Sequence, residues 1–149
     1  MAEYTANTAQ TVNANNNVLL TSTPVKGSNS IIHREGSGLV TLRGITQQCR
    51  ARFKVTFGGN IAVPTGGTAE AISLAIAING EPIATTTMIE TPAAVEQYNN
   101  VASSVYIDVP KCCCAQISVE NTSTQAILVQ NANLIVDRVA EGDIRKWKD

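Results

Sequence analysis

The sequence predicts an all-β protein, an antiparallel sandwich of about nine or ten strands in one domain. Short segments of alternating polar and apolar residues run along most of the 149-residue chain, and glycine-rich turn signals separate them. Apolar residues make up 44% of the composition but aromatic residues only 4%, so we expect a core of small and β-branched side chains. Such a core buries little area per residue, and association between copies of the chain would add stability.

The N-terminal half begins with a polar segment and continues with short strands. Residues 1–17 are rich in Asn, Thr and Ala and have little periodicity, which predicts an extended arm or edge segment. The domain itself is expected to span residues 18–140, followed by a charged C-terminal tail over residues 141–149. Turns containing glycine or proline separate the first predicted strands, which are 18–22, 30–34, 39–43 and 49–57.

The segment 49–57 has the clearest alternation in the chain. Gly58 and Gly59 follow it and predict a break or a bulge. The alternation predicts one buried and one polar face, with Cys49, Ala51, Phe53, Val55 and Phe57 on the first and Arg50, Arg52, Lys54 and Thr56 on the second.

The second half predicts further strands and one segment with helical character. Asn79-Gly80 is a strong hairpin signal, and it joins a strand at 71–79 to one at 83–89. Residues 91–100 begin near a proline and have weak helical character, so a short crossing helix is expected there. The remaining predicted strands are 101–109, 114–121 and 126–139.

The predicted strand 71–79 has small side chains on one of its two faces. Ser73, Ala75 and Ala77 alternate with larger apolar residues, which predicts that another layer or subunit approaches closely there. An ordinary exposed face is the alternative interpretation.

Charge is nearly balanced over the whole chain but not along it. The net charge is −1, which gives no field that would attract nucleic acid or an anionic membrane, and we expect neither as a partner. Residues 1–69 contain six basic and two acidic residues, a balance of +4, whereas residues 70–149 contain five basic and ten acidic residues, a balance of −5. Either these are ordinary solvated faces, or opposite faces of neighbouring subunits steer each other, with Arg50 and Arg52 at the interface.

The chemistry-bearing residues do not form a recognisable catalytic or metal-binding motif. The four cysteines are Cys49 and the run 112–114. Adjacent residues of a strand point to opposite faces, so one chain is a poor zinc site, and buried small side chains are the expected role. A ring of three thiolates on a threefold axis is the alternative. His33 has no neighbouring Ser, Cys or Asp that would suggest a triad. We therefore expect neither an enzyme nor a cofactor site.

The chain ends suggest where it is made and how it attaches. Met1 is followed by a polar run, and no apolar stretch has transmembrane length, which predicts a protein that is made and kept in the cytoplasm, or is assembled there into something later released. The tail combines one tryptophan with basic residues, a composition suited to an acidic and partly apolar groove of a larger partner. A frayed, solvated tail is the alternative. The predicted docking residues are Ile144, Arg145, Lys146, Trp147 and Lys148.

Four phrases carry a resemblance over residues 18–140. They read SIIHREGSGLVTLRG, CRARFKVTFGGNIAVPTGGT, ISLAIAINGEPIA and ISVENTSTQAILVQNANLIVDRVA. They resemble small structural proteins of phages and prophages of gut Firmicutes, which are similar to the jelly roll of the tumour-necrosis-factor (TNF) and complement C1q trimers. The resemblance implies a ten-stranded jelly roll, a homotrimer and a place in the virion. It implies a capsid decoration protein bound to the major capsid protein or other virion proteins, or alternatively a head-fibre or tail-associated module that binds a host surface.

Overall fold

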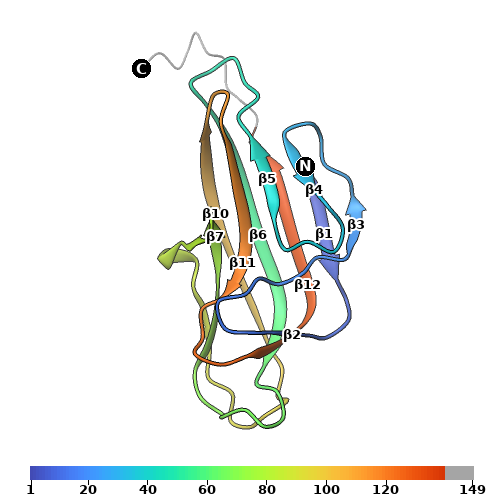
Figure 1. Cartoon of the computed structure of the whole chain (residues 1–149), viewed down its shortest axis with the longest axis vertical. Helices are drawn as coiled ribbons and strands as arrows, with labels where there is room; N and C mark the ends of the chain where they lie inside the picture. Colours follow the sequence, from blue (N-terminus) through green and yellow to red (C-terminus); the bar gives the residue numbers. More distant parts are fainter. Residues whose placement is uncertain (140–149) are drawn as a thin grey trace.

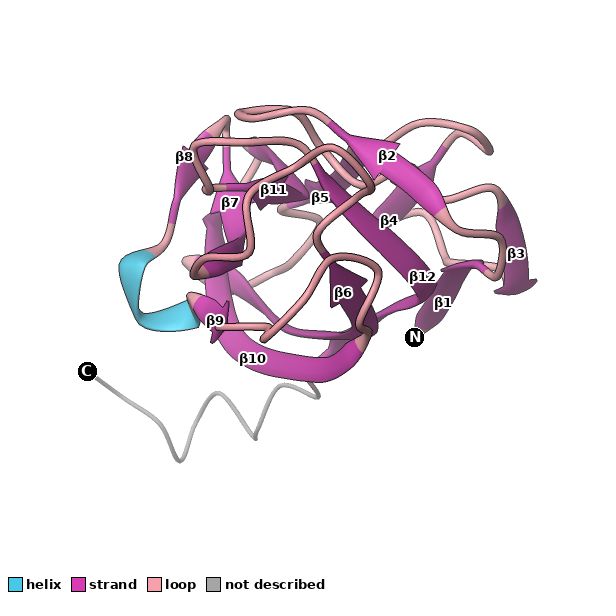
Figure 2. Cartoon of the chain, turned by 90° about the horizontal axis from the view of Figure 1, so that it is seen from below, coloured by secondary structure: helices cyan, strands magenta, loops and turns pink. Residues whose placement is uncertain are grey.

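The computed structural model describes residues 1–139, which form two antiparallel sheets of six strands each. Figure 2 looks along the long axis and shows the two layers facing each other. Sheet I has the order β10 (Asn99–Pro110), β6 (Arg50–Ala62), β12 (Ile127–Arg138), β1 (Ala2–Ala6) and β3 (Ser22–Val25), with β2 (Gln10–Val12) also paired to β12. Sheet II has the order β4 (Ile31–His33), β5 (Val40–Arg43), β11 (Cys114–Asn121), β7 (Ile72–Ile78) and β8 (Glu81–Pro82), with β9 (Met88–Glu90) also paired to β7. The predicted all-β antiparallel sandwich is confirmed.

The hydrophobic core fills the space between the two sheets. The alternation predicted for the segment 49–57 is present in β6, where Phe53, Val55 and Phe57 are fully buried and Arg52 and Lys54 are exposed. Most other core side chains are aliphatic, as the composition predicted. The largest fully buried side chains are Tyr4, Phe53, Phe57, Leu20, Leu42, Ile61, Ile72, Leu74, Ile76, Ile117, Ile127 and Leu134.

The Asn79-Gly80 turn joins β7 and β8 as predicted. Both residues have positive φ, 51° and 84°, which two-residue hairpin loops of type I′ require. The predicted strand 83–89 is interrupted, however, by a 3-10 turn over Ala84–Thr86. The Thr86 hydroxyl accepts a hydrogen bond from the Ile76 amide at 2.9 Å, so a side chain takes the place of a strand partner there.

Two local predictions were wrong. Residues 91–98 form bends and a turn rather than a helix, and the Glu96 amide donates to the Val63 carbonyl. The Gly58-Gly59 pair does not interrupt β6, which stays in register with β10 throughout. The irregularity lies instead on β12, between Gln130 and Asn133, where Asn131 has a φ of 56°. A bulge on the partner strand leaves β6 continuous.

The N-terminal segment differs from the predicted arm. Its residues 2–6 form β1, which lies inside sheet I between β12 and β3 (Figure 1). Ala2, Tyr4 and Ala6 are at most 3% exposed, because they face the core while the side chains between them face outward. The Tyr4 ring also contacts the ring of His33 in sheet II, at 4.3 Å between centroids. The segment is therefore an integral part of the sandwich.

Candidate interaction surfaces

The outer side of β6 and β10 in sheet I forms an uncovered surface, which we call the open face. The inner side of the same strands packs on the core, and no described element covers the outer side, where residues of β10 such as Ala102, Ser104 and Tyr106 are exposed. Strand pairing places Ala102 beside Gly58, Ser104 beside Thr56 and Tyr106 beside Lys54. The centre of the open face thus consists of small uncharged residues, which allow another surface to approach closely.

One end of the open face is held by ion pairs. Arg52 binds Asp108 through two hydrogen bonds, Nε to Oδ1 at 2.7 Å and Nη2 to Oδ2 at 3.0 Å. Arg50 Nε lies 3.1 Å from Asp108 Oδ2, and Lys54 Nζ lies 6.0 Å from the centre of the Tyr106 ring. The hydrogen bond from Arg52 lowers the pKa of Asp108. Two guanidinium groups share one carboxylate, so this end of the face stays positively charged.

Replacing Asp108 should destabilise the fold slightly and only above acidic pH. We expect Asp108→Asn to lower the free energy of unfolding by about 1 kcal/mol or less at neutral pH, since exposed ion pairs contribute little. Because the folded chain has the lower pKa for this carboxyl, the contribution is complete above the unfolded value of about 3.9 and is lost as the pH falls through the folded value. Urea unfolding at several pH values measures this, with exposed Glu81→Gln as the control. A difference that persists in strong acid would contradict the prediction.

The residues predicted for a subunit interface fall into two groups. Arg50 and Arg52 lie on the open face, where a neighbouring subunit could contact them. Ala75 and Ala77 are instead 0% exposed within the single chain, so they offer no surface to a partner. Ser73 is half-buried, and its hydroxyl lies 2.6 Å from that of Thr122.

The face of β7 that contains Ser73, Ala75 and Ala77 is thus covered by the chain itself. Ser118, directly across from Ala77 on β11, supports this, because it is only 2% exposed. The small side chains therefore mark close packing within one subunit.

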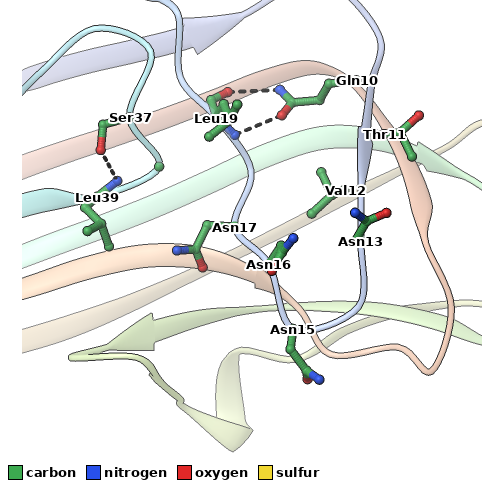
Figure 3. A pocket seen from close by; sticks show the side chains of 11 residues that line it. Gln10, Thr11, Val12, Asn13, Asn15, Asn16, Asn17, Leu19, Ser37 and Leu39 are labelled. Carbon is green, nitrogen blue, oxygen red and sulfur yellow. Dashed lines mark hydrogen bonds between the residues drawn. The ribbon is translucent and has the colours of Figure 1, made fainter.

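A polar groove lies between β2, the loop that follows it and residues 37–39 (Figure 3). Its volume is about 520 Å³, within the range of small-ligand sites. The Gln10 side chain shapes one wall, since its amide both donates to and accepts from the backbone of Leu19 at 2.9 Å. No charged and no aromatic side chain lines the groove, whose main polar residues are Thr11, Asn13, Asn15, Asn16, Asn17 and Ser37.

The groove has the chemistry of a site for a neutral, polar ligand. Amide side chains both donate and accept hydrogen bonds, and those of Asn13 and Asn16 are exposed at its rim. Leu19 and Leu39, which are 47% and 38% exposed, add apolar surface beside them. Asn121 holds the backbone of the lining residue Val12, because its buried amide nitrogen donates to the Val12 carbonyl at 2.9 Å. The alternation of polar and apolar residues does not predict this groove, although its lining includes the asparagines of the segment 13–17, which stand out in the sequence.

The cysteines differ from the prediction that they fill the core. All four are exposed and free, because Cys49 lies just before β6 and the other three lie in or beside the turn between β10 and β11. Within residues 1–139, no group of three His, Cys, Asp or Glu side chains is arranged to hold a metal ion.

His33 makes structural contacts, and its Nε2 donates to the Ser37 carbonyl at 2.9 Å. None of the helical segments in residues 1–139 is long and apolar enough to cross a membrane. The predicted docking residues 144–148 lie outside the described residues.

Comparison with known proteins assigns the fold. No protein-family profile and no curated protein matches the chain. Among solved structures, the globular domain of zebrafish complement 1qA covers 95% of this chain and 98% of its own, with a TM-score of 0.65 and 8% identity. Eiger TNF from S. frugiperda gives a TM-score of 0.66 at 11% identity and covers 95% of this chain and 93% of its own. The chain has a TNF/C1q-like jelly-roll fold.

Murine APRIL has the same kind of jelly roll, with a TM-score of 0.58, 11% identity and coverage of 91% of this chain and 98% of its own. At these identities the similarity concerns the fold and not the function. The jelly roll implied by the resemblance of the sequence is thereby confirmed.

Proposed function

We propose that this jelly-roll protein is a virion structural protein, a homotrimeric capsid decoration protein that stabilises the head of a phage. The observation that carries the proposal is the TNF/C1q-like jelly roll with an uncovered outer side on sheet I. This fold is shared by trimers, and the small residues at the centre of the open face suit contact between copies. The phrase-level resemblance to phage structural proteins supports the place in the virion.

Decoration would be a mechanical function. Trimers assembled in the bacterial cytoplasm would bind the major capsid protein or other virion proteins and bridge neighbouring capsomers. Each contact can be weak, because simultaneous binding through three subunits raises the overall affinity by orders of magnitude. The residues for this attachment are the tail positions Ile144, Arg145, Lys146, Trp147 and Lys148, which combine an aromatic anchor with positive charge.

Binding to particles tests this function. Purified protein is mixed with phage particles that lack it, and the bound copies are counted by cryo-electron microscopy. We expect regular density over threefold or quasi-threefold positions of the capsid. A variant that lacks residues 141–149 should remain trimeric and lose this density. Density confined to the phage tail or to a vertex, or no density, would contradict the decoration function. Full occupancy after the deletion would exclude residues 141–149 as the anchor.

The groove favours a second function within the same class, a head-fibre or tail-associated module that binds a host surface glycan. Its uncharged amides and hydroxyls match the hydroxyl groups of a neutral sugar. We expect binding to neutral members of a bacterial glycan array, and a loss of about tenfold or more in the double variant Asn13→Ala/Asn16→Ala, since two hydrogen-bonding groups are removed. Thr21→Ala, an exposed substitution outside the groove, is the matched control. Equal binding by both variants would contradict a glycan site in the groove.

A further inference from the structure

All four cysteines of the chain lie at one tip of the molecule. Figure 1 shows this tip at the upper end, where the loop 44–49 lies beside the turn between β10 and β11. Backbone hydrogen bonds hold the segments together, from the Lys111 amide to the Cys49 carbonyl at 3.0 Å and from the Gly44 amide to the Cys113 carbonyl at 2.8 Å. We call the group Cys49, Cys112, Cys113 and Cys114 the cysteine tip.

The exposure of these side chains is unusual. Free cysteine is among the most frequently buried residue types, yet every cysteine here is exposed. The turn itself adds a second observation, because Cys112 has a φ of 66°, a conformation that favours glycine and costs other residues about 1 kcal/mol. The turn therefore holds a thiol at the surface in a position where glycine would be more stable.

The thiols of the tip are not paired directly across the neighbouring strands. The position directly across from Cys49 is Lys111 rather than a thiol, because the pairing of β6 with β10 continues in register to this point. Cys113 and Cys114 are adjacent, and adjacent side chains of an extended segment point to opposite sides. A bond between Cys113 and Cys114 is therefore disfavoured, and Cys49 has no thiol directly across from it.

The tip is also continuous with the open face. Cys49 directly precedes β6 and the turn directly follows β10, the two strands that form that face. In an assembly with cyclic symmetry, equivalent residues lie at the same height around the axis. Subunits that meet through their open faces therefore bring their cysteine tips to the same end of the assembly. Cationic side chains border the tip at Arg43, Arg50 and Lys111, which favours the approach of anionic thiol reagents.

We propose that the cysteine tip is a covalent cross-linking site, at which disulfides join copies of this chain within the homotrimer. This inference rests on the proposed self-association. The oxidant is a small-molecule disulfide of the glutathione class. The thiolate of one copy attacks it, which forms a mixed disulfide and releases one small thiol. A thiolate of a second copy then attacks the protein sulfur, which forms the inter-chain disulfide and releases the second small thiol. Two protein thiols are oxidised, their protons pass to the two released thiols, and one small disulfide is reduced.

Oxidation with glutathione disulfide tests the cross-link. The full chain is treated at two concentrations that differ tenfold and is analysed on non-reducing gels and by intact mass. We expect covalent dimers and trimers that form at a rate independent of protein concentration, because the reacting tips already share one assembly. The triple variant Cys112→Ser/Cys113→Ser/Cys114→Ser should form at most dimers through Cys49, at least about tenfold more slowly, since most of the local thiols are gone.

A displaced thiol is the matched control. In a variant with all four cysteines replaced by serine and with Ile89→Cys, a single exposed thiol lies on sheet II, away from the tip. We expect it to cross-link at a rate proportional to protein concentration. Equal rates for this variant and the natural chain would overturn the inference, as would monomers that carry only glutathione adducts or an internal disulfide. The mass in reducing buffer separates the two proposals, because a trimer that fails to cross-link disproves only the cysteine tip, whereas a monomer disproves the self-association.

Discussion

A variant that begins at residue 7 is expected to lose the folded state. It lacks β1, which pairs with β12 on one side and β3 on the other. The strand β3 therefore loses its partner in the sheet, and β12 keeps only β6 and β2. It also lacks the buried side chains of Ala2, Tyr4 and Ala6. Circular dichroism and solubility measure the outcome. A soluble variant with unchanged strand content would contradict the integral role of β1. It would instead support the predicted extended arm.

Single substitutions measure how much each face of β1 contributes to the stability of the fold. Tyr4 is 2% exposed and contacts the ring of His33, and Tyr4→Ala is expected to lower the free energy of unfolding by about 3 kcal/mol or more, as truncation of large buried aromatic residues does. Thr5→Ala on the outward side of the same strand is the control, with an expected change of about 0.5 kcal/mol or less. Chemical denaturation measures both values, and similar losses in the two variants would contradict the assigned inward face.

A charge at the centre of the open face should abolish self-association without unfolding the chain. Ser104 is exposed and lies beside Thr56 in the register of β10 and β6, so Ser104→Arg adds its side chain on the solvent side of the sheet. A charge that is buried without a partner in a subunit interface costs several kcal/mol. We expect a monomeric mass in analytical ultracentrifugation. The circular dichroism spectrum should be unchanged from that of the natural chain.

Ile89→Arg is the matched control for this substitution. It introduces the same charge at a strand position of sheet II that is 66% exposed, and it should leave the trimer intact. If Ser104→Arg remains trimeric, the open face is not the interface. If both variants dissociate, the loss reflects added charge in general rather than the position of Ser104.

The fold was predictable where local chemistry determines it. The alternation from Ala51 to Phe57 and the Asn79-Gly80 turn depend on neighbouring residues, and both predictions were confirmed. The N-terminal strand was missed because two of its three buried residues are alanines, which leaves Tyr4 as its one strong hydrophobic signal. The expected helix at 91–100 was inferred from weak propensity, which tertiary contacts override.

The candidate surfaces were harder to predict from the sequence than the strands, because they form only when distant segments pair in the fold. Arg52 and Asp108 are 56 positions apart in sequence, and only the pairing of β6 with β10 brings them together. The burial of Ala75 and Ala77 and the exposure of the cysteines likewise depend on which elements cover which face. Alternation identifies two faces of a strand but not what lies on each of them.

The mass of the natural chain in solution tests the central claim most directly. Size-exclusion chromatography with light scattering, in reducing buffer and at micromolar protein concentration, reports it without any particle or ligand. Self-association as a homotrimer predicts a mass about three times the 15.8 kDa of one chain. A mass equal to that of one chain across the accessible concentration range would contradict it.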